Sequence, residues 1–267
     1  MKFDRDLLRQ IFNLTAIISA FGINIWANLA PIKGLTIGEI SQQIFGNVLI
    51  TPASYAFVIW GVIYLGLISF AVYQVLPTQR SQEKLRRLGY SLVFASLAQI
   101  VWVFLFLSRW FVLSLGAMIG ILLSLITGYL KLRTVEAKFS RQERWWIVIP
   151  LSIYLSWISV ATILNVAIAL SSVNWDGWGI SPVVWTAVMI AVAGIIGATV
   201  IKQRRDRAFG LVLIWALIAI AVRHREIVAI AATAIIVAFA LILVLFFQFW
   251  RSRHHNFKSA SKNLKRN

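Results

Sequence analysis

Long apolar stretches, separated by short polar and charged segments, run along almost the whole chain. A helix that crosses a bilayer needs about 20 mostly apolar residues, with a range of about 17–25. In lipid such a helix satisfies its backbone hydrogen bonds internally. We therefore expect an all-α integral membrane protein with about eight transmembrane helices. These are Ile11–Ala30, Ala53–Leu76, Leu88–Leu107, Phe111–Leu130, Trp145–Leu170, Val183–Ile201, Ala208–Val222 and Ile227–Trp250.

The positive charges fall in alternate connecting segments and so predict an orientation. The N-terminus, every second connection and the segment after Trp250 together hold 22 Lys and Arg residues, against 4 in the other connections. Cytoplasmic connections of membrane proteins carry the excess of Lys and Arg. We expect both termini in the cytoplasm, in a plasma-type or inner membrane.

Two segments are less regular than the others. Ala208–Val222 is about 22 Å long at 1.5 Å per residue, short for a hydrocarbon core of about 30 Å, so whether it spans fully stays open. Arg251–Asn267 is polar and basic, and we expect it to be a disordered cytoplasmic tail.

Composition limits the chemistry further. The chain of 267 residues is 60% hydrophobic and 13% charged, with a net charge of +17, no Cys and three His. The basic charge is explained by the cytoplasmic connections and requires no nucleic acid. The apolar stretches contain no acidic, basic or His side chain at mid-depth, so acid–base and metal chemistry lack their groups there. We expect no enzyme activity, no metal and no required cofactor.

Neutral polar residues do lie within the expected helices. Asn13, Asn24 and Asn28 share one side of the first helix, Gln99 lies in the third, and Thr162 and Asn165 lie in the fifth. Such groups either join helices through hydrogen bonds or line a cavity. Both interpretations stay open, and they agree if a pocket lies between helices one, three and five.

Aromatic residues recur on the helix faces that carry these polar groups. Residues three or four apart lie on the same face of a helix. The faces are Phe57, Trp60 and Tyr64 in helix two, Gln99, Trp102 and Phe106 in helix three, and Tyr154, Trp157, Ala161 and Asn165 in helix five. Together they suit a flat, apolar ligand with a few polar edges.

Small residues at a spacing of four mark close helix contacts. Gly116 and Gly120 have this spacing in the fourth helix, as do Ala193 with Gly197 and Gly194 with Ala198 in the sixth. We favour packing within the chain, and a homodimer through these faces stays open.

Three segments together resemble the TspO/MBR family of tryptophan-rich sensory proteins, which is related to the mitochondrial translocator protein. They are YAFVIWGVIY (55–64), QIVWVFLF (99–106) and YLSWISVATILN (154–165), in the order and on the helices of the family. The resemblance covers about residues 5–175. Tyr55 stands where the family usually has Trp, and Gln99 replaces the third-helix Asn. Three helices follow that the five-helix members lack, as in a longer, divergent branch.

The resemblance implies a five-helix bundle (1–175), followed by three additional helices (176–250) and the basic tail (251–267). It implies a pocket between helices one, two and five, with Pro31–Thr51 as its lid. By matching position, Trp60, Tyr64, Trp157, Ala161 and Asn165 would line the pocket. We add Tyr55, Phe57, Trp102, Gln99, Asn24 and Asn28 as further candidate ligand-binding residues.

Members of the family bind porphyrins and sterol-like apolar ligands, so the resemblance implies a sensory or carrier protein for tetrapyrroles, with porphyrin or haem as candidate ligand. The alternative is a permease-type or scaffold subunit that works with a partner membrane or ATPase chain. An enzyme acting on a lipid or porphyrin ranks last, since the membrane interior lacks an acid or base.

Overall fold

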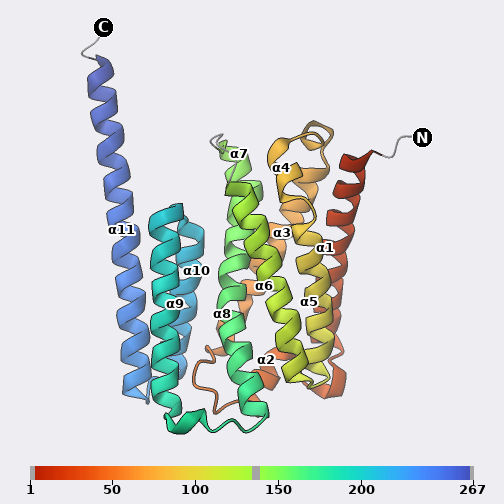
Figure 1. Ribbon diagram of the computed structural model, residues 1–267, viewed down its shortest axis with the longest axis vertical. Helices are drawn as coiled ribbons and strands as arrows, with labels where there is room; N and C mark the ends of the chain where they lie inside the picture. The colour runs from red at the N-terminus through yellow and green to blue at the C-terminus, as the bar shows by residue number, and fades with distance from the viewer. Residues whose placement is uncertain (1–3, 134–138, 265–267) are drawn as a thin grey trace.

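The computed structural model describes residues 4–133 and 139–264, and these residues are helical throughout apart from short connections. The long helices are α1 (Arg5–Leu29), α3 (Ile59–Val75), α5 (Ser91–Leu107), α6 (Phe111–Arg133), α8 (Ile149–Ser172), α9 (Pro182–Arg204), α10 (Arg207–Arg223) and α11 (Val228–Leu264). They correspond to the eight expected segments, which confirms the all-α membrane fold. Figure 1 shows them running side by side, with the start of α1 and the end of α11 at the same end of the molecule.

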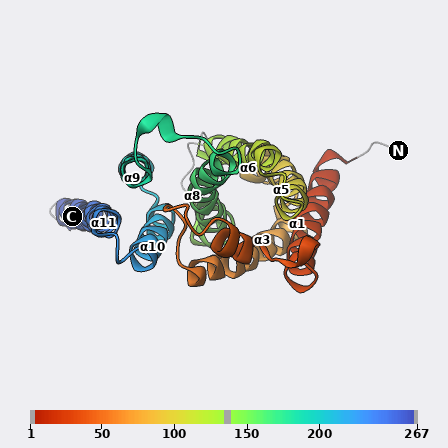
Figure 2. The same ribbon diagram turned by 90° about the horizontal axis from the view of Figure 1, so that it is seen from below.

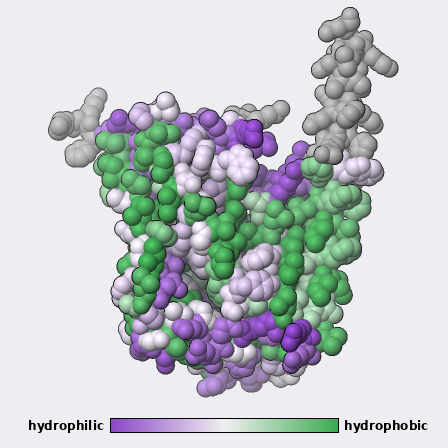
Figure 3. Space-filling model, turned by 180° about the vertical axis from the view of Figure 1, so that it is seen from behind, coloured by the Kyte–Doolittle hydropathy of each residue, from purple (hydrophilic) through white to green (hydrophobic). Residues whose placement is uncertain are grey.

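Among the described residues, six helical segments are long and apolar enough to cross a membrane, and one of them, Ser54–Val75, consists of a short helical turn followed by the 17-residue α3. The two long helices outside these six segments, α5 and α10, have 17 residues each, about 26 Å at 1.5 Å per residue. That length is at the lower limit of the range for a spanning helix. A mostly hydrophobic band covers the middle of the molecule between hydrophilic ends (Figure 3), as expected for surface in contact with lipid.

Short helical turns complete the two ends. On the end that carries the start of α1 lie η4 (Pro77–Gln79), α4 (Glu83–Leu88), α7 (Arg141–Glu143) and the π-helical turn η5 (Arg144–Val148). On the opposite end lie η1 (Ile32–Gly34), α2 (Ile37–Glu39), the π-helical turn η2 (Ile40–Ile44), η3 (Ser54–Val58) and η6 (Gly177–Gly179). Residues 134–138, within one expected cytoplasmic connection, lie outside the described residues.

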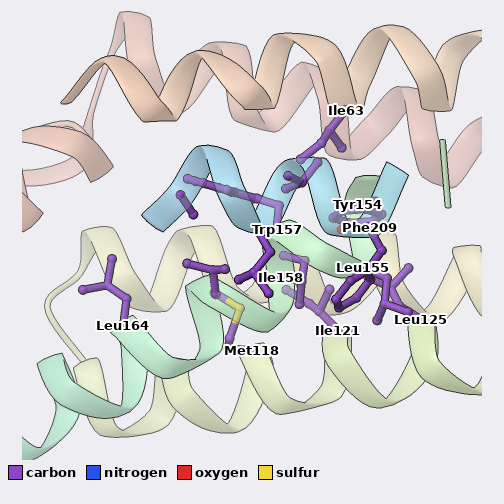
Figure 4. Close-up of a cluster of buried hydrophobic side chains, with 14 of the residues drawn as sticks. Ile63, Met118, Ile121, Leu125, Tyr154, Leu155, Trp157, Ile158, Leu164 and Phe209 are labelled. Atoms are coloured by element: carbon purple, nitrogen blue, oxygen red, sulfur yellow. The ribbon is translucent and has the colours of Figure 1, made fainter. Parts of the chain in front are cut away.

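The first five long helices close a ring in the order α1, α3, α8, α6 and α5, and α5 returns to α1 (Figure 2). Where α8 meets α6, Leu155 and Ile158 of α8 form a buried cluster with Ile121 and Leu125 of α6 (Figure 4). Phe209 of α10 reaches the same cluster from outside the ring. Helix α8 therefore packs on two sides, against α3 and α6 within the ring and against α10 outside it.

The last three helices form a second layer against α8. Helix α10 packs on α8, and α9 and α11 pack on α10 and on each other. A Cβ atom at Gly194 would come within 2.4 Å of Val237 Cγ1, and one at Gly197 within 2.3 Å of Leu213 Cδ2. The small residues of α9 thus serve close packing within the chain, as favoured. A Cβ at Gly116 would meet no atom within 4 Å.

The prediction that Arg251–Asn267 is disordered is wrong for residues 251–264, whose backbone continues α11 to Leu264. This stretch contains neither Gly nor Pro, so no residue breaks the helix that arrives from the apolar segment. Figure 1 shows α11 projecting beyond the other helices. Residues 265–267 lie outside the described residues.

Candidate functional site

A small internal cavity lies inside the ring, towards the end that carries α2. The space open to the centre of a water-sized molecule is about 30 Å³, enough for roughly two waters. Helix α8 supplies one wall with Trp157, Ala161, Asn165 and Ile168. Because these residues follow each other at intervals of three or four, they form one continuous face of the helix.

Aromatic rings from three further segments close the cavity. Phe57 lies edge-on to Trp157, with ring centroids 5.9 Å apart. Trp60 of α3 stacks on Tyr64 at 5.8 Å, and Trp102 of α5 stacks on Phe106 at 5.1 Å. The lining is therefore flat and apolar, which suits a planar apolar ligand.

Asn165 is a polar residue in this lining whose hydrogen bonds are already in use. Trp102 Nε1 donates to Asn165 Oδ1 at 2.6 Å, and Asn165 Nδ2 donates to Ser114 Oγ at 3.2 Å. These two bonds join α5, α6 and α8. Both interpretations of the polar residues thus hold for Asn165, because it joins helices through hydrogen bonds and also lines the cavity.

Trp157, in contrast to Asn165, has a polar group in the lining that lacks a hydrogen-bond partner among the described residues. Its side chain is 2% exposed, and its Nε1 is buried without a hydrogen-bond partner among the described residues. A buried donor without a partner costs free energy, and in a native structure it calls for an explanation. A ligand or water in the cavity that offers an acceptor to Trp157 Nε1 would remove that cost.

A buried hydrogen-bonded group lies beside the cavity without lining it. Gln99 Nε2 donates to Tyr64 Oη at 3.1 Å, and Tyr154 Oη donates to Gln99 Oε1 at 2.5 Å. Tyr64 Oη also donates to the carbonyl oxygen of Ala20 at 3.4 Å. Gln99, Tyr64 and Tyr154 therefore hold α1, α3, α5 and α8 together behind the aromatic rings.

Three candidate ligand-binding residues lie away from the cavity. Asn28 is exposed and donates to the carbonyl oxygen of Asn24 within its own helix, at 2.8 Å. Tyr55 is 39% exposed and packs edge-on against Trp215 of α10. Among the described residues, none of α1 lines the cavity, which lies between α3, α5, α6 and α8. The resemblance implied a pocket between helices one, two and five, which are α1, α3 and α8.

Other lining residues escaped the sequence analysis. Ile37, Ser41 and Pro52 come from the expected lid and the residue after it, and Met118 comes from α6. None of these four residues belongs to a helix face with aromatic residues three or four positions apart, which is the pattern that identified the predicted lining residues. Ile168 could have been found, because it extends the Trp157–Asn165 face by three residues. No group of three or more His, Asp or Glu among the described residues is placed to hold a metal ion.

The segment that joins the lid to α3 is fastened to the second layer of helices. Ala53 N donates to the carbonyl oxygen of Ala219 at 3.0 Å, and Trp215 Nε1 donates to that of Ala56 at 3.3 Å. His224 Nε2 lies 3.1 Å from the carbonyl oxygen of Thr51. Because a carbonyl oxygen only accepts, Nε2 of His224 must donate. Helix α10 and its C-terminal cap thus hold the segment next to Pro52 and Phe57, which line the cavity.

Acidic pH is expected to destabilise this attachment. Burial lowers the pKa of His224, opposed by the hydrogen bond to Thr51, and the neighbouring Arg223 lowers the pKa further. A His whose pKa is lower in the folded state contributes full stability above its unfolded pKa of about 6.5 and loses it as the pH falls. The melting temperature of the purified protein should therefore fall between about pH 7.5 and about pH 5, the range in which His titrates.

The matched variants separate this effect from other titrations. His224→Gln should lose most of the pH dependence, whereas His254→Gln with His255→Gln should keep it. Equal pH dependence in the wild type and in His224→Gln would contradict the assignment.

The fold and the cavity define a class: a helical membrane protein whose five-helix ring encloses a small, aromatic cavity. The family model described as "TSPO-like protein" matches residues 10–247, and the chain belongs to this family. The match confirms the resemblance seen over about residues 5–175, and it continues through α9, α10 and most of the apolar part of α11. No curated protein and no solved structure matches the chain.

Proposed function

We propose that this protein binds a flat, apolar ligand in the cavity of the five-helix ring, with a tetrapyrrole such as a porphyrin as the first candidate. The supporting observation is the buried Trp157 Nε1, a donor without a partner within a lining of aromatic rings. Membership of the TSPO-like family supports a ligand-binding or sensory role in the membrane in general terms. The tetrapyrrole is our own narrower assignment.

Binding of so large a ligand requires the cavity to open. A space for roughly two waters cannot hold a porphyrin with the side chains as they stand. The lid side is the part that can move at least cost, because Ile37, Ser41 and Pro52 belong to short turns rather than to a long packed helix. We therefore propose that ligand binding displaces the segment 31–58 and that α10 limits this displacement.

The proposed role is binding for sensing or transport rather than catalysis, in a membrane whose cytoplasmic side faces the end with the start of α1 and the end of α11. The charge distribution along the sequence supports this orientation. The lid then lies on the opposite, extracytoplasmic side. A partner permease or ATPase chain remains the alternative if no ligand binds.

Loss of the Trp157 donor is expected to weaken porphyrin binding. Trp157→Phe keeps an aromatic ring in the lining but removes Nε1, and one hydrogen bond contributes about 0.5–1.5 kcal/mol, or about 2- to 12-fold in affinity. Titration of the detergent-purified protein with protoporphyrin, followed by the absorption band of the porphyrin, measures the dissociation constant. We expect saturable binding by the wild type and weaker binding by Trp157→Phe.

Trp146→Phe is the matched control. Trp146 stacks on Tyr73 with centroids 6.4 Å apart and is 40% exposed, so the same substitution there leaves the cavity intact. Its affinity should equal that of the wild type. A linear, non-saturating change in all three proteins would indicate partitioning into the detergent micelle and would refute the tetrapyrrole proposal.

A further inference from the structure

A second, larger hollow opens on the surface at the lid end of the molecule, with a volume of about 610 Å³. Its lining comes from the lid (Ile44, Phe45), from the turn between α5 and α6 and the start of α6 (residues 109–113), and from the end of α8 (Ser172, Val173). The internal cavity is lined by earlier residues of the lid (Ile37, Ser41), by α5 (Trp102, Phe106) and by earlier residues of α8, together with residues 52–60 and Met118 of α6. In the lid, along α5 and its following turn, and along α8, the first residue of the hollow comes three or four positions after the last residue of the cavity.

In two of these segments, a residue that lines the cavity and one that lines the hollow are four positions apart, which places them on the same side of the segment. On α8, Ile168 lines the cavity and Ser172, four residues further on the same face, lines the hollow. In the lid, Ser41 lines the cavity and Phe45, also four residues further, lines the hollow. The hollow thus lies about one helical turn beyond the cavity along the same segments, towards the lid end.

One layer of aromatic side chains separates the cavity from the hollow. Phe45 meets Phe111 edge-on with centroids 4.7 Å apart, and Phe111 meets Phe106 edge-on at 5.4 Å. Phe45 and Phe111 line the hollow, whereas Phe106 lines the cavity. Movement of the Phe45 side chain, which belongs to the lid and not to a long helix, would connect them.

Arg109 is the charged residue in the lining of the hollow. Its backbone has a φ of +66°, in the left-handed region, at the turn between α5 and α6. Its guanidinium makes no hydrogen bond or ion pair to any side chain that the structure describes. An unpaired guanidinium beside Trp110, Phe45 and Ile44 can bind the carboxylate of a molecule whose remainder is apolar.

We propose that the hollow is the port through which the ligand reaches the cavity, that Arg109 selects ligands with an anionic carboxylate, and that Phe45 and Phe111 form the gate. The identity of the cavity as a ligand site rests on the proposed function. The route and its charge preference rest on the hollow, the aromatic layer and Arg109, and they are testable without any tetrapyrrole.

The absence of Cys from the chain makes a direct test feasible. A single cysteine is placed in the cavity by Ile168→Cys, and at a second position by Leu164→Cys, with the protein in lipid discs of neutral phosphatidylcholine. Two thiosulfonate reagents of similar size, one with a sulfonate and one with a trimethylammonium group, then modify the thiol. The modification rates follow from the intact mass of the protein.

We expect the ratio of anionic to cationic rates to fall at least about 5-fold in Arg109→Gln at low ionic strength, since electrostatic steering changes association rates by about 10- to 1,000-fold. Arg109→Lys keeps the charge and should keep the ratio. Arg225→Gln removes an exposed charge at the same end, outside the hollow, and should also keep it. Phe45→Ala should accelerate both reagents, and Phe239→Ala, on the exposed face of α11, should accelerate neither.

Unchanged ratios in Arg109→Gln, or unchanged rates in Phe45→Ala, at both cysteine positions would overturn the proposal. Association rates of protoporphyrin and its neutral dimethyl ester then separate it from the proposed function. If protoporphyrin binds and Arg109→Gln slows it no more than the ester, the proposed function stands and the port is wrong. If the reagents show the expected pattern and protoporphyrin does not bind, the port stands and the tetrapyrrole assignment is wrong.

Discussion

Replacement of Asp206 by alanine is expected to lower the free energy of unfolding by about 3–5 kcal/mol, the usual cost of leaving one partner of a buried ion pair alone. Asp206 is buried between α9 and α10, with a side chain that is 3% exposed. Its Oδ2 lies 3.0 Å from Arg133 Nη2 and accepts from Tyr129 Oη at 2.8 Å and from Ser152 Oγ at 2.6 Å. Substitution leaves all three donors without this acceptor.

Asp206 has a further role that adds to the loss. Its Oδ1 accepts from Phe209 N at 3.1 Å and so caps the N-terminus of α10. Replacing such a cap by alanine costs about 0.5–2 kcal/mol. Since α10 also holds the segment from Thr51 to Ala56, the loss should reach the lid, and limited proteolysis should cleave that segment sooner in the variant.

The measurement is the midpoint of unfolding of the detergent-purified protein in increasing dodecyl sulfate. Asp176→Ala is the control, because Asp176 caps a turn in the same way but is exposed. The double variant Arg133→Leu with Asp206→Leu should lose less than the sum of the two single variants, since no buried charge is left alone. A midpoint for Asp206→Ala that equals that of Asp176→Ala would contradict this role.

The sequence predicted the helices well because each apolar stretch carries its own evidence. Mean hydropathy over about 20 residues needs no knowledge of a neighbour. The faces of α3, α5 and α8 followed from helical spacing alone, and the structure brings Trp60, Trp102, Trp157, Ala161 and Asn165 around one cavity. The spacing of residues within one helix is therefore sufficient to predict which face of that helix lines the cavity.

What the sequence could not predict is which neighbour each face meets. Asn24 and Asn28 share a side of α1, but that side lies away from the cavity, and Asn28 bonds to its own helix. The attachment of α10 to Thr51 and Ala53 joins residues about 170 positions apart. No spacing rule within one helix reports such contacts.

Charged residues near the helix ends carry a second lesson. Arg9 and Lys84 belong to the Lys and Arg residues that predicted the cytoplasmic side, and both are buried, as is the acidic Asp206. Lys84 Nζ lies 2.7 Å from Glu143 Oε2, and Arg9 Nη2 donates to the carbonyl oxygen of Arg80 at 2.8 Å. Each charge has a partner on another segment, so the cationic residues also fix the connections of the ring.

Replacement of Gln99 by leucine should have the second largest effect on stability. Gln99 is 1% exposed and bonds to both Tyr64 and Tyr154. A buried polar group left without a partner, here the Tyr154 hydroxyl, costs about 1–3 kcal/mol, and the lost hydrogen bond to Tyr64 adds about 0.5–1.5 kcal/mol, so the total is about 2–4 kcal/mol. Tyr64 Oη keeps its hydrogen bond to the carbonyl oxygen of Ala20, whereas the hydroxyl of Tyr154, a residue that is 2% exposed, loses its acceptor Gln99 Oε1.

Unfolding midpoints in dodecyl sulfate again provide the measurement, and Gln203→Leu, at an exposed position near the end of α9, is the matched control. Addition of Tyr154→Phe to Gln99→Leu should restore part of the loss, because it removes the hydroxyl that was left alone. Gln99→Asn is the more informative variant: its amide is one methylene shorter and cannot reach both hydroxyls, although it matches the residue usual in the family at this position. Two results would contradict this role: a Gln99→Leu variant as stable as the wild type, or a double variant that loses more stability than the two single variants together. Either result would mean that the hydroxyls find other partners and that apolar packing alone holds the four helices together.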